Sequence, residues 1–126
     1  MTLGICDRFH PHWPKFEWIG AGAQGLGWTV MRMLDRADLE KLSPACDWIL
    51  FSQRPPVARE DLESLSAVKR CPWVAWVFDL LGHGLGDGLL EEIPWHIFDV
   101  VLCKNPEALP MHPKVIWLDQ GAPLWR

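Results

Sequence analysis

The sequence contains no tyrosine, no cluster of basic residues and no long apolar run. Its longest uncharged stretch, Trp18 to Met31, includes four glycines. A membrane-spanning helix needs roughly 20 mostly apolar residues, so we expect no membrane span. Twelve Lys and Arg residues against sixteen Asp and Glu residues leave a net charge of -4. This balance offers no positive surface to a phosphate backbone, so we expect no nucleic-acid partner.

Several short motifs of enzymes and metal sites are also missing. The sequence has no G-x-S-x-G, no P-loop and no H-E-x-x-H, which argues against serine hydrolases, P-loop nucleotidases and zincins. There is no C-x-x-C pair either, because the four cysteines lie 25 or more positions apart, in or beside apolar runs, at Cys6, Cys46, Cys71 and Cys103. We interpret them as reduced core thiols and expect no metal and no cofactor. Residues 1–7 lack the basic and apolar segments of a secretory signal, so we expect a cytoplasmic location.

The composition is typical of one globular domain. The chain has 126 residues, of which 49% are hydrophobic and 22% charged. A chain of roughly 100–150 residues buries about two thirds of the surface that it exposes when unfolded. Residues 1–126 should therefore form a single domain that is stable without a metal or a disulfide. The nine tryptophans indicate either a bulky core or platforms for stacking.

Five short apolar runs, each bounded by polar or turn-forming residues, predict strands buried on both faces of a sheet. They are Leu3–Cys6, Trp48–Phe51, Trp73–Phe78, Val100–Cys103 and Val115–Leu118. Between these strands, apolar residues at helical spacing predict helices over Gly25–Arg36 and Asp61–Arg70. The pattern over Leu89–Phe98 predicts a weaker helix, and we expect at most one turn over Pro106–Leu109. Alternating strands and helices predict an α/β fold, a Rossmann-like three-layer α/β/α sandwich with a mainly parallel sheet of about five strands.

Polar groups follow directly after every predicted strand. They are Asp7 and Arg8, then Ser52, Gln53 and Arg54, then Asp79, then Lys104 and Asn105, and finally Asp119, Gln120 and Gly121. Ligands of open parallel sheets bind beyond the carboxyl ends of the strands, where the strand order reverses. With these strands in the order 3-2-1-4-5, the reversal is flanked by Asp7, Arg8, His10, His12, Lys104 and Asn105. The alternative is that polar residues follow strands because loops face water.

The segment Gly20–Gly25 matches G-x-G-x-x-G. Glycines at this spacing let backbone N–H groups approach a phosphate, so Gly20, Gly22 and Gly25 are candidate binding residues in a flexible loop that contacts an anion or a sugar. A nicotinamide cofactor fits less well, because no strand directly precedes the motif and the next predicted strand ends in Ser52 and Gln53. A purely structural loop remains a third interpretation.

Two residues are candidate general bases. His10 follows the first predicted strand, and an imidazole pKa near 6.5 suits proton transfer at neutral pH. His10 and His12 together could bind a metal, but with no cluster of Cys, Asp or Glu nearby an exposed polar loop is the favoured interpretation. Asp79 ends the third predicted strand, where it could hold a sugar hydroxyl or act as a base. It could instead cap a helix or pair with Arg54 or Lys104.

Three segments resemble a known family when they are taken together in order. They are Cys71–Asp79, Phe98–Asn105 and Val115–Ala122. They look like the N-terminal half of a GT-B glycosyltransferase, especially the CgeB-like group of spore-maturation proteins. The resemblance implies a two-domain enzyme in which this half shapes the acceptor side of the cleft and a C-terminal half binds most of the nucleotide-sugar donor. By position, the residues facing the cleft would be Asp79, Asn105, Gln120, Gly121 and the segment His10–Gly25.

The resemblance predicts a domain that binds a sugar or nucleotide sugar and transfers a glycosyl group when a second half completes it. His10 or Asp79 would activate the acceptor hydroxyl. Lys104 and backbone N–H groups near Gly20–Gly25 would offset charge on the leaving phosphate. Since the chain ends at Arg126, we expect either a fragment without its donor-binding domain or a stand-alone half that assembles as a homo-oligomer. The alternative is a non-enzymatic module that binds a small ligand or associates through tryptophans.

Overall fold

The computed structural model describes residues 1–9, 14–52, 54–77, 95–103 and 113–117. These residues form one six-stranded sheet in which every neighbouring pair of strands is parallel. The strands are β1 (Thr2–Cys6), β2 (Thr29–Met33), β3 (Trp48–Ser52), β4 (Trp73–Val77), β5 (Val100–Cys103) and β6 (Val115–Trp117). The predicted α/β fold with a parallel sheet is therefore confirmed.

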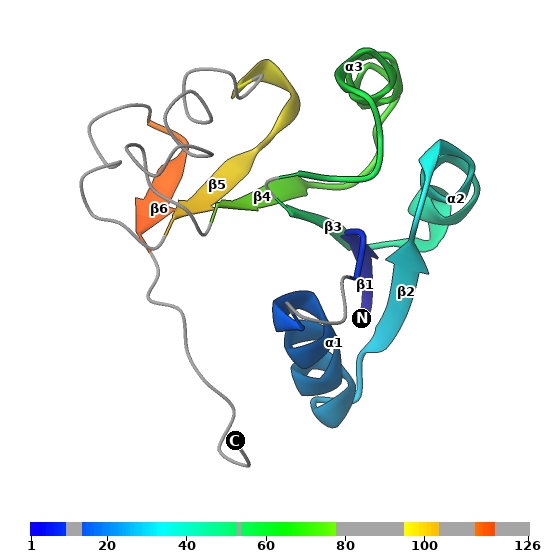
Figure 1. Ribbon diagram of the computed structural model, residues 1–126, viewed down its shortest axis with the longest axis vertical. Coiled ribbons are helices and arrows are strands. Elements are labelled where there is room, and N and C mark those ends of the chain that lie inside the picture. Colours follow the sequence, from blue (N-terminus) through cyan, green and yellow to red (C-terminus); the bar gives the residue numbers. More distant parts are fainter. Residues whose placement is uncertain (10–13, 53, 78–94, 104–112, 118–126) are drawn as a thin grey trace.

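Helices cover both faces of this sheet (Figure 1). The helix α1 (Lys15–Gly25) packs on β1 and β2 from one side, which we call the α1 face. The helices α2 (Arg36–Leu42) and α3 (Arg59–Ser66) lie on the other side, the α2–α3 face. Two short 3-10 turns complete the described elements, η1 (Ser43–Ala45) and η2 (Trp95–Ile97). The arrangement is the expected three-layer sandwich, and no helix among the described residues is long and apolar enough to cross a membrane.

Each face of the sheet has its own apolar core, because successive side chains of a strand point to opposite faces. The larger core lies under α2 and α3 and contains the fully buried side chains of Met33, Ile49 and Val101. In it the rings of Phe51 and Trp73 pack at a tilt, with 4.8 Å between their centres. The smaller core lies under α1 and is built from Leu3, Ile5, Phe16, Ala23, Leu50 and Val74. Parallel strands need cover on both sides, and these two cores supply it over β1 and β3.

The helix predicted over Gly25–Arg36 is wrong, since this segment contains β2. Thr29 and Val30 are β-branched and favour extended backbone. All five residues of β2 pair with β1, from Thr2↔Thr29 to Cys6↔Met33. A helix does form next, because Asp35 caps α2 by accepting the Asp38 N–H at 2.8 Å.

The flexible loop predicted at Gly20–Gly25 is also wrong, since these residues lie in α1. Phe16, Gly20 and Ala23 are the buried residues of this helix, at spacings that place them on one helical face. A Cβ atom at Gly20 would lie 3.5 Å from Ile5 Cδ1 and 3.5 Å from Val30 Cγ1. The packing of this face against β1 and β2 outweighs the low helix propensity of glycine.

The predicted strand order is corrected as well, because the sheet has the order β2-β1-β3-β4-β5-β6. The order reverses between β1 and β3, not between β1 and the strand Val100–Cys103. The helix expected over Asp61–Arg70 is confirmed as α3, with an earlier start and end. Of the weaker helix expected over Leu89–Phe98, the described part holds only the η2 turn. Residues 89–94 and 106–109 lie outside the described residues.

Candidate functional site

The carboxyl ends of β1 and β3 lie side by side where the strand order reverses. In open α/β sheets this is the place where ligands bind. Ser52 ends β3 here and is 7% exposed. Its Oγ atom is buried and has no hydrogen-bond partner among the residues that the structure describes. Ser52 lies two positions after Leu50, so its side chain is on the α1 face.

The chain turns sharply after β1. The half-buried Asp7 accepts the backbone N–H of Phe9 at 2.9 Å through Oδ2. Phe9 has a φ of 52°, a left-handed conformation that is uncommon for a residue other than glycine. Between them, Arg8 is exposed at the edge of the sheet. The turn therefore leaves one carboxylate and one guanidinium beside the end of β3.

A small cavity of about 140 Å³ lies next to this turn on the α1 face. The guanidinium of Arg32 covers the ring of Phe9 at 4.1 Å, and Arg32 Nη2 lies 2.6 Å from Glu17 Oε1. Both charged side chains are about half exposed, at 53% and 47%. Their ion pair therefore adds little stability by itself, but it fixes the wall of the cavity.

The helix α1 begins at the same edge of the sheet. It follows the carboxyl end of β1, and it ends near the start of β2, where Thr29 N–H donates to Met1 O at 2.9 Å. Pro14 occupies its N-cap position, and its side chain makes no capping hydrogen bond. The N-terminus of a helix carries a partial positive charge that favours anions. This charge lies on the α1 face, the face on which Ser52 is buried.

Of the predicted site residues, only Asp7 and Arg8 lie at this edge among the described residues. Gly20 is buried within α1 against the sheet, while Gly22 and Gly25 face open space. Gly25 ends α1 at the opposite edge, so the three glycines form no phosphate-binding turn. His10, Asp79, Lys104, Asn105, Gln120 and Gly121 lie outside the described residues, and their roles stay predictions. Ser52 is among the polar groups that follow the apolar runs in the sequence, but it was not predicted to be a binding residue.

The cysteines are thiols, as expected, and none forms a disulfide. Cys6, Cys46 and Cys103 are buried, and Cys71 is half-buried. Burial raises the pKa of Cys6 to about 12, and nearby carboxylates add to the effect. Thiols with such a raised pKa are poor nucleophiles and poor metal ligands near neutral pH. Among the described residues, no group of three or more His, Cys, Asp or Glu side chains could hold a metal ion.

Comparisons with known proteins identify no family for this chain. No protein-family model matches the chain, and searches of curated proteins and of solved structures gave no match.

Proposed function

We propose that this chain is a small-molecule-binding α/β domain whose ligand is a nucleotide sugar or a related phosphorylated sugar. The site is the carboxyl edge of the sheet between β1 and β3. The observation that carries the proposal is the buried Oγ of Ser52 at this edge, which has no hydrogen-bond partner in the described part of the chain. The likeness of three sequence segments to a GT-B glycosyltransferase half supports the same ligand class.

A buried hydroxyl without a partner costs roughly 1–3 kcal/mol. Such a cost is tolerated at functional sites, where a ligand supplies the missing hydrogen bond. Ser52 can donate one hydrogen bond and accept others. A sugar hydroxyl is a matching partner because it both donates and accepts.

The charges around Ser52 fit the two parts of such a ligand. Asp7 can accept hydrogen bonds from sugar hydroxyls at the free carboxylate oxygen. Arg8 is exposed and cationic, and the start of α1 carries the partial positive charge of a helix N-terminus. Both favour a phosphate or diphosphate group.

Glycosyl transfer is the reaction that we propose when a second half brings the donor. Transfer breaks the bond between the sugar and the diphosphate and forms a bond to an acceptor oxygen, while a base removes the acceptor proton. His10 and Asp79 are the candidates for this base. The described residues contribute binding and orientation, through Ser52, Asp7 and the start of α1.

Calorimetric titration with UDP-glucose, UDP and glucose tests the proposal. We expect UDP-glucose to bind and S52A to weaken binding by about three- to tenfold, the worth of one hydrogen bond. The matched control is S64A, because Ser64 is an exposed serine of α3 on the other face. Binding of UDP-glucose that is the same in S52A and S64A contradicts the site, and binding of none of the three compounds contradicts the ligand class.

A non-enzymatic module that associates with itself is the second candidate, and two exposed apolar residues favour it. Trp48 is 43% exposed and Ile116 is 49% exposed. Trp48 lies on the α1 face, two positions before Leu50, and Ile116 pairs with Leu102, which packs against the same core. Light scattering of the wild type and W48S distinguishes this candidate: a dimer that W48S dissociates supports it, and a monomeric wild type contradicts it.

A further inference from the structure

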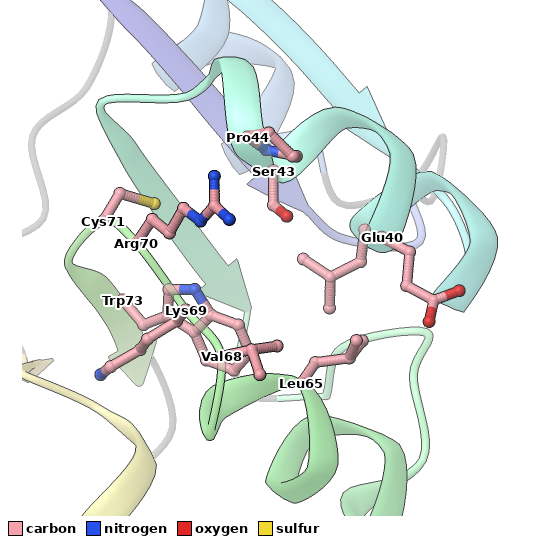
Figure 2. A pocket seen from close by; sticks show the side chains of 10 residues that line it. Glu40, Ser43, Pro44, Leu65, Val68, Lys69, Arg70, Cys71 and Trp73 are labelled. Atoms are coloured by element: carbon pink, nitrogen blue, oxygen red, sulfur yellow. The ribbon is translucent and has the colours of Figure 1, made fainter.

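A groove lies between α2 and α3, at the amino edge of the sheet and therefore opposite the Ser52 site (Figure 2). It has a volume of about 370 Å³, within the range of small-molecule sites. We call it the α2–α3 groove. It is lined by Leu39, Glu40, Ser43, Pro44, Leu65, Val68, Lys69, Arg70, Cys71 and Trp73.

The walls of the α2–α3 groove are apolar. Leu39 and Trp73 are nearly fully buried, with 1% and 2% exposure, and form fixed parts of the lining. Leu65 is half-buried, and Val68 is 71% exposed at the rim. An apolar ligand part in this groove would remove water from Leu65 and Val68 without any change in the core below them.

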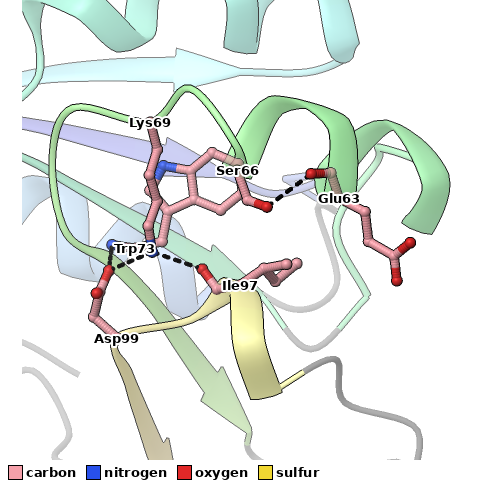
Figure 3. Close-up of polar contacts among 6 residues, drawn as sticks. All are labelled: Glu63, Ser66, Lys69, Trp73, Ile97 and Asp99. Carbon is pink, nitrogen blue, oxygen red and sulfur yellow. Dashed lines mark hydrogen bonds and ion pairs between the residues drawn. The ribbon is translucent and has the colours of Figure 1, made fainter.

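Of the two basic residues that line the groove, Lys69 is already engaged. Its Nζ atom lies 2.7 Å from Asp99 Oδ2 and donates to the Ile97 carbonyl at 2.9 Å (Figure 3). These contacts hold Lys69 against the start of β5, so its charge is matched within the fold. Lys69 therefore supports the wall of the groove and does not offer a charge to a ligand.

Arg70 is different. Its side chain is exposed and forms no ion pair or hydrogen bond with any residue that the structure describes. Figure 2 shows its guanidinium reaching from the turn before β4 toward Ser43 of η1. Ser43 is half-buried and adds a hydroxyl at the same end of the groove. A guanidinium with a hydroxyl beside it is suited to a carboxylate.

The other end of the groove carries the opposite charge. Glu40 lies there, and it pairs loosely with Arg36, at 3.6 Å between Glu40 Oε1 and Arg36 Nη2. The C-cap of α2 is Ser43, so the partial negative charge of this helix end lies beside Arg70, whose full positive charge exceeds it. A ligand anion is therefore favoured at Arg70 and repelled at Glu40, which fixes the direction in which an amphipathic ligand can lie.

We propose that the α2–α3 groove binds a small amphipathic carboxylate. The carboxylate pairs with Arg70 and accepts a hydrogen bond from Ser43, and the apolar body lies against Leu65 and Val68. This site is separate from the proposed nucleotide-sugar site, because the two lie at opposite edges of the sheet.

Titration with phenylbutyrate, followed by backbone amide and indole NMR signals, tests this proposal. We expect millimolar or tighter binding, with signal changes at Leu65, Val68 and Trp73. The neutral analogue phenylbutanol should bind at least about threefold more weakly, since it cannot form a charged pair with Arg70. R70Q should weaken phenylbutyrate binding by about three- to tenfold and leave phenylbutanol binding unchanged.

Two further variants separate the groove from general surface charge. V68E should weaken binding of both compounds, and it should fold because Val68 is 71% exposed. K41Q is the matched control, because Lys41 is an exposed cation of α2 that does not line the groove. K41Q should bind phenylbutyrate like the wild type. Equal losses in K41Q and R70Q would overturn the proposal, because they would reflect net charge alone.

Cys71 provides an independent measure of occupancy. It lines the groove and is half-buried, whereas the other three cysteines are buried. Phenylbutyrate should slow the alkylation of Cys71 by iodoacetamide in the wild type and have less effect in R70Q. Failure of phenylbutyrate to bind, or binding without protection of Cys71, would overturn the proposed location. Unchanged phenylbutyrate binding in S52A is expected, and it separates this test from that of the nucleotide-sugar site.

Discussion

Asp99 accepts the backbone N–H of Trp73 at 2.8 Å, so that a carboxylate just before β5 fixes the first residue of β4. The same Oδ2 atom lies 2.7 Å from Lys69 Nζ, in the turn that follows α3 (Figure 3). One carboxylate therefore connects three consecutive parts of the chain at the amino edge of the sheet. Lys69 also lies 5.7 Å from the centre of the Trp73 ring, which it helps to cover.

Loss of this carboxylate should destabilise the fold. We expect D99A to lower the free energy of unfolding by about 1–2 kcal/mol, because the Trp73 N–H loses its acceptor and Lys69 loses its partner. D99N should cost less, about 0.5–1 kcal/mol, because the amide oxygen can still accept from Trp73 while the pair with the half-exposed charge is lost. Urea unfolding of the three proteins near pH 7 measures both values.

The Asp99 contribution should depend on pH. Partial burial raises the pKa of Asp99, but the hydrogen bonds from Lys69 and Trp73 and the charge of Lys69 outweigh this effect and hold the pKa below its ordinary value. A lowered pKa in the fold means that the stability is present above the unfolded pKa of about 3.9 and is lost as the pH falls below it. The stability gap between wild type and D99N should therefore shrink below about pH 4. A gap that stays constant down to pH 2 would contradict the assignment.

The glycines of α1 should respond to alanine as helix residues do. Gly22 lies within α1, and a Cβ atom there would meet nothing within 4 Å. G22A should stabilise the protein by about 0.5–1 kcal/mol, because alanine loses less backbone entropy in a helix. Gly27 is the matched control, since its φ of 85° is unfavourable for any other residue. G27A should destabilise by about 1–2 kcal/mol, and thermal unfolding of both variants measures the two shifts.

In the protein without ligand, the Ser52 hydroxyl should lower the free energy of unfolding. Removal of its unpartnered hydroxyl in S52A should leave the free energy of unfolding unchanged or raise it by up to about 1 kcal/mol. Ser66 provides the contrast, because its hydroxyl donates to the Glu63 carbonyl at 2.8 Å. S66A should lower stability by about 0.5–1 kcal/mol. A clear loss of stability in S52A would mean that this hydroxyl has a partner in the folded chain.

The buried thiols should reduce stability at alkaline pH. Burial, with smaller effects of Cys71 and Asp47, raises the pKa of Cys46 to about 11. An unfolded cysteine ionises near pH 8.5, so above this value the unfolded chain loses a proton that the folded chain keeps, and stability falls as the pH rises toward 11. No tyrosine titrates in this range. The loss of stability between pH 7 and pH 10 should be smaller in C46A than in the wild type, as read from urea midpoints.

The sequence predicted the strands better than the helices, for a physical reason. Strands buried on both faces are continuous apolar runs, and Leu3–Cys6 and Trp48–Phe51 were found in this way. The helix α1 has three glycines and its signal is only the spacing of Phe16, Gly20 and Ala23. Its stability comes from contact with β1 and β2, which no local pattern contains.

The candidate site was predicted in part. The rule that polar residues gather at the carboxyl edge of the sheet placed Asp7 and Arg8 correctly at the edge. The position of the reversal was missed because β2 was read as a helix, and without β2 the order around β1 cannot be deduced. That the Ser52 hydroxyl is buried with no partner among the residues placed by the structure depends on packing from several elements, so a local sequence pattern does not contain it.

The order of the sheet sets the order in which it can be assembled during synthesis. The strand β1 pairs with β2 on one side, as in Thr2↔Thr29, and with β3 on the other, as in Leu3↔Trp48. After this, β4, β5 and β6 each join the edge formed by the strand before them. A chain that leaves the ribosome from its N-terminus can therefore pair every strand as it emerges. None of these six strands has to insert between two that are already joined.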